Sequence, residues 1–295
     1  MPIRHAARVV PAVLALCGLA ATPPALAGKP KVEELAPFLP WNVDWTDKTC
    51  VLQRGFGTVE DPLVLRLERF GPQPGFQLVV TGKRLTPVSQ GDTLYIRYGE
   101  GGPVHRINRV LIGDTKGGAR SIFVPRTSIA GDLHDTRADP AITEEMERKV
   151  TRISLARVHG REIVLKTGPL DKAFAAWRKC TRQLVATWGL DPEQQERLQR
   201  AATPRNDPGI WLHGDDYPVG ALAKGAQAIV NFRLIVDAAG VPTDCEIQRS
   251  YSGELFDKAS CRALMARARF EPALDEAGKP IASYYTSVIS WIMSP

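Results

Sequence analysis

Residues 236–273, VDAAGVPTDCEIQRSYSGELFDKASCRALMARARFEPA, place one cysteine in a strand-like run and another in a helix-like run. The first run alternates apolar and polar residues, which predicts a strand with Cys245 on its core face. The second run has apolar residues at helical spacing, so it predicts a helix whose core-facing stripe contains Cys261. Pro272 ends this helix, because proline cannot continue the hydrogen-bonded backbone.

The residues on both sides of this stretch complete a small α+β domain, which we place at residues 209–295. Residues 226–237 alternate strictly and predict a strand that forms a hairpin with residues 241–250. Residues 282–293 have apolar side chains on both faces and predict a final strand. The expected order is therefore strand, strand, helix, strand, with the helix covering one face of the sheet.

The cysteine pair is best explained as a disulfide that pins the helix to the sheet. A bridge between Cys245 and Cys261 would close a loop of about 17 residues, which stabilises by roughly 3 kcal/mol in the chain-entropy model. The alternative is a pair of free buried thiols. The sequence has no Cys-x-x-Cys motif and no cluster of histidine and cysteine, so we expect no metal site.

The sequence predicts a mainly-β domain, β-sandwich or barrel, at residues 41–190. Short runs rich in Val, Ile, Leu and aromatic residues alternate with Gly, Pro and Asp through residue 168. Residues 170–188 then change to helical spacing and predict a helix that closes the domain, with Cys180 on its covered face. Four cysteines allow three pairings, and their core-facing positions favour Cys50 with Cys180 and Cys245 with Cys261.

The remaining segments predict export and flexible connections. Residues 1–27 carry arginines before an apolar run of about thirteen residues and end in Ala-Leu-Ala, which is typical of a cleaved signal peptide. That run is too short to be a stable membrane anchor, so we expect a periplasmic protein. We interpret residues 28–40 as a flexible lead and residues 191–208 as a short solvated helix running into a linker.

The sequence also argues against several functional classes. A formal charge of +6 without a dense basic stripe does not favour nucleic-acid binding. The four histidines beyond the leader are isolated in the sequence, and the motifs LHDTRADP and LHGDD are interpreted as surface loops. We therefore expect neither an enzyme nor a cofactor. The four histidines are His105, His134, His159 and His213.

The C-terminal part carries a series of short motifs in a fixed order over about eighty residues. The motifs are Tyr217-Pro218, Gly225, Val236-Asp237 with Gly240, Ser252-Gly253 with Asp257, Phe270-x-Pro272-Ala273, Gly278-x-Pro280 and Trp291. In their order and spacing they resemble the C-terminal domain of the TonB energy transducers. The resemblance implies a non-catalytic periplasmic module that binds peptide segments of outer-membrane transporters and transmits force from an inner-membrane motor. The transducers also have an uncleaved membrane helix and a long Pro-rich spacer, and neither is expected in this chain.

The resemblance implies that a partner binds at two places in the C-terminal domain. One is Tyr217-Pro218, and the other is the last strand, which we expect at a sheet edge, where it can accept an extended peptide. The candidate residues are Tyr217, Pro218, Tyr284, Thr286, Val288 and Trp291. In the alternative, the first domain or a second copy in a dimer masks this edge and the aromatic residues serve only packing.

Two functional hypotheses remain open at this point. The first is a TonB-like binding protein whose partner is an outer-membrane transporter segment or another periplasmic protein. The second is a periplasmic hydrolase or ligand-binding β protein that uses the C-terminal module for docking. A buried histidine with an aspartate partner, in a deep cleft of the first domain, would favour an enzyme.

Overall fold

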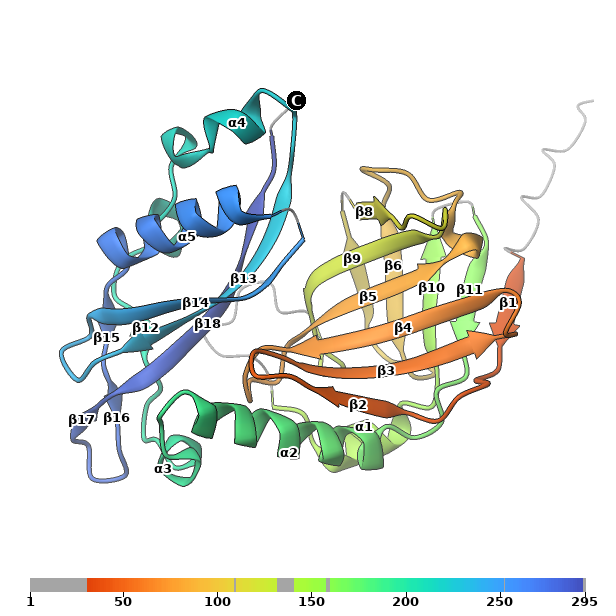
Figure 1. Cartoon of the computed structure of the whole chain (residues 1–295). Helices are drawn as coiled ribbons and strands as arrows, with labels where there is room; N and C mark the ends of the chain where they lie inside the picture. The colour runs from red at the N-terminus through yellow and green to blue at the C-terminus, as the bar shows by residue number, and fades with distance from the viewer. Residues whose placement is uncertain (1–30, 109, 132–140, 158–159, 252, 294–295) are drawn as a thin grey trace, which may run out of the picture.

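The computed structural model describes residues 31–108, 110–131, 141–157, 160–251 and 253–293. The predicted signal peptide, residues 1–27, and the histidines His134 and His159 lie outside these ranges. Two bodies lie side by side, an N-terminal pair of sheets and a C-terminal sheet with a helix on one face (Figure 1). Among the described helices, none combines the length and the apolar character needed to cross a membrane.

The N-terminal domain is a sandwich of two mainly antiparallel sheets, so the mainly-β prediction is confirmed. The larger sheet has the order β2 (Asn42–Trp45), β3 (Cys50–Gly57), β4 (Pro62–Arg69), β5 (Phe76–Gly82), β9 (Arg120–Thr127), β8 (Leu111–Asp114). The smaller sheet has the order β1 (Val32–Leu35), β11 (Glu162–Leu165), β10 (Ile153–Arg157), β6 (Leu94–Tyr98), β7 (Val104–Ile107). Alternate residues of β4, Leu63, Leu65 and Leu67, are fully buried, as expected for strands with one core face.

One strand-like run of the sequence forms two strands in different sheets. Residues 104–113 read as a continuous run, but they form β7 in the smaller sheet and β8 in the larger one. Val110, between the two strands, is fully buried in the core. The chain therefore crosses from one sheet to the other at a buried apolar residue, which local alternation could not reveal.

The expectation that residues 28–40 form a flexible lead is wrong for their described part. Residues Val32–Leu35 form β1, which pairs in parallel with β11, and Leu35 is buried. Glu33 forms an ion pair with Arg161 at 2.8 Å, and Glu34 forms one with Lys166 at 2.6 Å. The acidic side chains make this segment look solvated, but its backbone closes an edge of the smaller sheet that would otherwise be unpaired.

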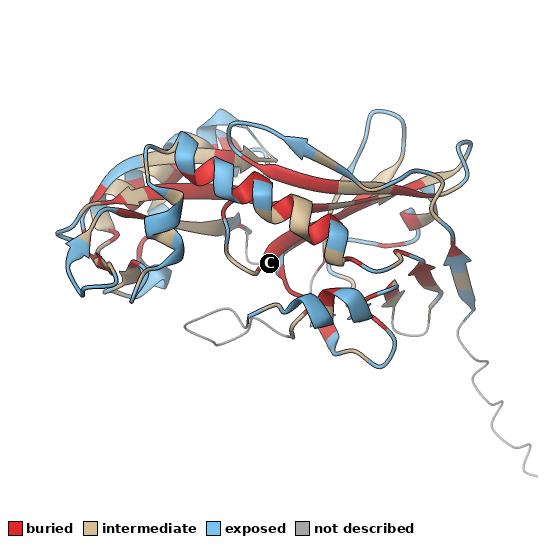
Figure 2. Cartoon of the chain, turned by 90° about the horizontal axis from the view of Figure 1, so that it is seen from below, coloured by how far each residue is buried: buried red, intermediate tan, exposed pale blue. Residues whose placement is uncertain are grey.

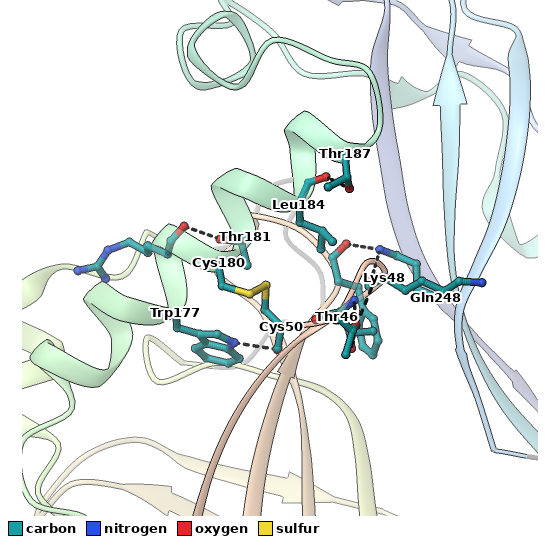
Figure 3. The surroundings of a disulfide bond; sticks show 12 residues. Thr46, Lys48, Cys50, Trp177, Cys180, Thr181, Leu184, Thr187 and Gln248 are labelled. Carbon is teal, nitrogen blue, oxygen red and sulfur yellow. Dashed lines mark hydrogen bonds between the residues drawn. A yellow bond between two sulfur atoms is a disulfide. The ribbon is translucent and has the colours of Figure 1, made fainter. Parts of the chain in front are cut away.

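Helix α2 (Asp171–Thr187) closes the N-terminal domain, as predicted. Its buried residues recur at helical spacing, and exposed or intermediate residues lie between them (Figure 2). The indole Nε1–H of Trp177 donates to the carbonyl oxygen of Cys50 at 2.8 Å, next to the disulfide Cys50–Cys180 (Figure 3). The short helix α1 (Glu144–Lys149) packs beside α2 through Arg178, which pairs with the buried Glu147.

The C-terminal domain has the predicted order of strand, strand, helix and strand. Its sheet has the order β14 (Pro242–Ser250), β13 (Ala228–Val236), β18 (Ser283–Trp291), and α5 (Glu254–Arg267) packs on β14 and β13. The disulfide Cys245–Cys261 joins β14 to α5, so the predicted pairing is present in both domains. Short elements complete the domain: β12 (Thr203–Pro204), α4 (Val219–Leu222), β15 (Phe270–Glu271), β16 (Ala273–Leu274) and β17 (Pro280–Ile281).

The segment 191–208 is not the solvated linker that its composition suggests. It begins with the expected short helix, α3 (Pro192–Glu196), whose N-cap Asp191 accepts backbone N–H bonds. Further along, β12 pairs with β15 of the C-terminal domain, and Ala202 is buried in that domain's core. Charged side chains point outward here while the backbone adds to the sheet structure, so the end of this segment belongs to the C-terminal domain.

Candidate functional site: an edge strand beside the domain interface

Strand β18 lies at an edge of the C-terminal sheet, as the family resemblance implied. Among the described strands it pairs only with β13, over nine consecutive register positions without a bulge. The other edge strand, β14, has two register shifts against β13. Bulges disturb the regular spacing of backbone groups and discourage further pairing. Of the two edges, β18 is therefore the regular one that an added strand can follow.

One hydrogen bond identifies which backbone groups of β18 face the open edge. The N–H of Tyr251 donates to the carbonyl oxygen of Ile229 at 3.1 Å, so Ile229 directs its backbone groups toward β14. Successive residues of a strand direct theirs to opposite sides, so Val230 faces β18, where its register partner is Ile289. It follows that alternate residues of β18 direct their N–H and C=O groups away from β13. These residues are Tyr284, Thr286, Val288 and Ser290.

Two of the predicted partner-binding residues are packing residues. The ring of Tyr217 contacts those of Phe256 and Trp291, each with ring centroids 5.5 Å apart, and its hydroxyl donates to the carbonyl oxygen of Ala226. Burial raises the pKa of Tyr217. Trp291 is buried, and its indole N–H donates to Ser260 at 3.1 Å. Both rings hold the start of the domain against α5, which was the packing alternative.

The other predicted residues lie nearer the N-terminal domain or at the surface. The ring of Tyr284 contacts that of Trp188 at 4.9 Å, and burial raises the pKa of this tyrosine. Thr286 accepts a hydrogen bond from the side chain of Gln73. Val288 is half-buried, and Pro218 is half-buried at the start of α4. The side chains of Tyr284 and Thr286 therefore contact the first domain, while the backbone edge of β18 has no partner strand within the described residues.

A buried polar cluster centred on Glu68 joins the two domains, and sequence reasoning missed it. The carboxylate of Glu68, fully buried on β4, accepts hydrogen bonds from Gln77 and from the Tyr251 hydroxyl, both at 2.7 Å. Asn231 of β13 donates to Gln77 at 3.2 Å. Arg66 completes an ion pair with Glu68 at 2.5 Å. A buried carboxylate is costly unless it is paired and hydrogen-bonded. The C-terminal domain supplies one of these hydrogen bonds, from the hydroxyl of Tyr251.

Other contacts extend the interface along β14 and α2. The side chain of Gln248 donates to the carbonyl oxygens of Lys48, at 3.0 Å, and Phe70, at 2.7 Å, as Figure 3 shows in part. The guanidinium of Arg233 lies over the Trp188 ring at 5.2 Å. The sheet face opposite α5 is therefore covered by the first domain. In the sequence, the sign of this contact was that polar residues occupy the strand positions that face away from α5. A sheet face exposed to solvent gives the same pattern.

The histidines and the acidic residues of the described ranges were the candidates for metal or acid–base chemistry. No group of three or more His, Cys, Asp or Glu side chains is arranged there to hold a metal ion. His105 is buried in the sandwich, where its ring contacts Tyr98 edge-to-face at 5.2 Å. His213 is exposed, and its backbone N–H donates to Asp216 at 2.8 Å. The ring of His105 is thus part of the core packing, and His213 contacts Asp216 through its backbone.

The comparison with known families concerns the domain that contains β18. Residues 214–293 match the family model described as the Gram-negative bacterial TonB protein C-terminal. The C-terminal domain is TonB-like. No curated protein matches the chain. The matched residues of the TonB-like domain include the hairpin, α5 and the edge strand β18, so the resemblance inferred from the sequence is confirmed.

Proposed function

We propose that this protein is a non-catalytic, periplasmic binding protein of TonB-associated transport, whose TonB-like domain binds extended peptide segments of outer-membrane transporters. The family match at residues 214–293 carries the proposal, because it assigns the domain to this class of transport. The leader pattern of residues 1–27 and two disulfides support an oxidising compartment outside the cytoplasm.

The regular edge of β18 supplies a mechanism for binding. A peptide that adds to this edge forms main-chain hydrogen bonds with the outward N–H and C=O groups of Thr286 and Val288, which contribute affinity. Side chains on either face of the added strand then contribute selection. One face of β18 borders the first domain at Tyr284, so the peptide side chains on that face would meet residues of both domains.

The alternative of an enzyme receives less support from the arrangement of titratable groups. His105 lies in the sandwich core against Tyr98, and it is not among the residues that line a cleft of about 440 Å³ in the described structure. That cleft instead lies between the two domains and supports the other half of the alternative, a ligand-binding role for the β domain.

A proline at Val288 tests the edge mechanism. The N–H of Val288 points away from β13, so Val288→Pro removes it without breaking a hydrogen bond between the two strands. Proline is tolerated at such edge positions. The control is Val288→Ala, which loses side-chain contacts only. We expect Val288→Pro to bind synthetic transporter N-terminal peptides about tenfold more weakly than this control, which corresponds to about one hydrogen bond. Calorimetric titration of the full chain lacking residues 1–27 measures the affinity, and circular dichroism checks the fold. Unchanged affinity in a folded Val288→Pro variant would contradict the mechanism.

A further inference from the structure

A cleft with a volume of about 440 Å³ lies between the two domains. Its N-terminal wall consists of Gln90, the whole of β8 with the following Thr115, and two residues of β9, Ser121 and Phe123. Its C-terminal wall comes from the ends of β13, β14 and β18. These elements lie on facing sides of the two domains (Figure 1). A cleft of this size at a domain interface is a common location for a ligand.

Strand β8 presents a second sheet edge at this cleft. It is the last strand of the larger sheet, and among the described strands it pairs only with β9. The N–H of Ile112 points away from β9, because it donates to the side-chain oxygen of Gln90 at 3.4 Å. This distance is long for a hydrogen bond. An exposed glutamine amide therefore occupies the position that the carbonyl group of a neighbouring strand would take.

The walls of the cleft combine apolar and polar residues, and Asp114 is the only charged one among the described residues that line it. The ring of Phe123 contacts that of Tyr251 at 4.7 Å, and the bond from the Tyr251 hydroxyl to Glu68 fixes this ring. Ile292 lines the opposite side and is 45 % exposed. The carboxylate of Asp114 is neutralised by the guanidinium of Arg120, with contacts of 2.9 and 3.2 Å. Such a lining suits a ligand with neutral hydrogen-bonding groups and apolar side chains.

We propose that this cleft binds an uncharged, extended peptide segment, which pairs with the outer edge of β8 in place of the Gln90 amide. The apolar side chains of the segment lie on Phe123, Tyr251 and Ile292. The inference rests on the proposed peptide-binding function but concerns a different edge, in the other domain. Because both domains build the walls, the site is complete only while the two domains are docked.

Variants at Ile112 and Gln90 test the pairing in the full chain lacking residues 1–27. The probe is an acetylated and amidated Leu-Thr-Leu-Thr-Leu peptide, titrated by NMR. Ile112→Pro removes the outward N–H, and Ile112→Ala is its control, since it loses the same apolar packing and keeps the N–H. We expect the proline variant to bind about tenfold more weakly than the alanine variant. Gln90→Ala removes the competing amide, so binding should strengthen by about threefold even if the proline variant does not fold.

Two further variants separate this proposal from the function proposed above. Val288→Pro should leave binding of this probe unchanged while it weakens the transporter peptides, because the two edges are distinct. Ile292→Glu should abolish probe binding, whereas Val219→Glu, at a residue 82 % exposed on α4, should not. Equal binding by the folded Ile112→Pro and Ile112→Ala variants, or unchanged binding after Gln90→Ala, would overturn the pairing. Loss of probe binding in Val288→Pro alone would assign the peptide to β18 and leave the proposed function intact.

Discussion

At the scale of single residues, Asp216 and Arg267 connect the start of the TonB-like domain to the end of α5. The two oxygens of Asp216 accept from both terminal nitrogens of Arg267, at 2.5 and 3.0 Å. Arg267 also donates to the carbonyl oxygen of Trp211 at 2.8 Å. A cation in the last turn of a helix is additionally favoured by the helix dipole. The hydrogen bonds from Arg267 hold the pKa of Asp216 at about 2, below its ordinary value of 3.8.

Replacing this carboxylate should cost stability in a pH-dependent manner. Because the folded-state pKa of Asp216 is lowered, its stabilisation is fully present above about pH 4 and is lost as the pH falls toward 2. We expect Asp216→Asn to reduce the free energy of unfolding by about 1–2 kcal/mol at pH 7, and the difference from wild type to shrink between pH 4 and pH 2. Urea unfolding at several pH values measures this.

The neighbouring aspartate provides the control for this measurement. Asp215 is exposed, so Asp215→Asn should change the free energy of unfolding by no more than about 0.5 kcal/mol. A difference between Asp216→Asn and wild type that stays constant from pH 7 to pH 2 would show that the carboxylate charge is not what stabilises this contact.

At the scale of elements, each disulfide attaches one helix to one sheet. Cys245–Cys261 attaches α5 to β14 within the TonB-like domain, and the two residues are 16 positions apart. Cys50–Cys180 attaches α2 to β3 and spans 130 positions, so it joins the beginning of the larger sheet to the end of the N-terminal domain. The longer loop constrains the unfolded chain more strongly, in the chain-entropy model.

Removing the two bridges should therefore have unequal effects. We expect Cys245→Ala with Cys261→Ala to lower the free energy of unfolding by about 3 kcal/mol, and Cys50→Ala with Cys180→Ala by about 5 kcal/mol. Urea unfolding of both double variants under oxidising conditions measures the losses, and peptide mapping confirms that the remaining bridge is intact. An equal or larger loss for the shorter loop would mean that strain or packing in the folded state, rather than loop length, sets the contribution.

At the scale of the whole molecule, the two domains are joined by buried polar groups rather than by a shared apolar core. The apolar clusters of the domains are separate, and beside a few ring contacts the interface contains buried polar groups such as Glu68, Gln77 and Tyr251. Polar groups impose direction on the docking, because each must meet its partner or remain buried and unsatisfied. The interface thus fixes the orientation in which the first domain covers the TonB-like sheet.

Removing one hydroxyl at this interface should weaken the docking of the domains. Tyr251→Phe keeps the ring on Phe123 but takes a donor from the buried Glu68 carboxylate, so we expect a loss of about 1–3 kcal/mol. In calorimetry, the unfolding transitions of the two domains should lie further apart in this variant than in wild type. Limited proteolysis near residues 189–202 should become faster. Tyr284→Phe is the control, because its ring stays on Trp188 at the same interface. Identical effects of the two variants would contradict the special role of the Glu68 cluster.

The sequence by itself determined the features that depend on local periodicity. The alternation of residues 241–250 and the helical spacing around Cys261 assign both cysteines to core faces, and this selects the observed pairing. The same alternation predicted the hairpin, and the position of the last strand at a sheet edge came from the family resemblance. Motif order also identified the family, because the turns of the domain require particular residues at fixed intervals. At Gly240, for example, φ is +81°, and a Cβ atom would lie 2.0 Å from the carbonyl oxygen of Phe270.

Only the tertiary structure decided what covers each face. Alternation in β4 places Glu68 on the face away from the sandwich core, where a charged residue is ordinarily solvated. It is instead buried by Tyr251, which lies 183 positions later in the chain. Likewise, β1 looks like a polar lead because its pairing uses backbone groups, which every residue type has. Periodicity reports the direction of a side chain, but the partner that it meets depends on contacts between distant segments, and no local pattern encodes those.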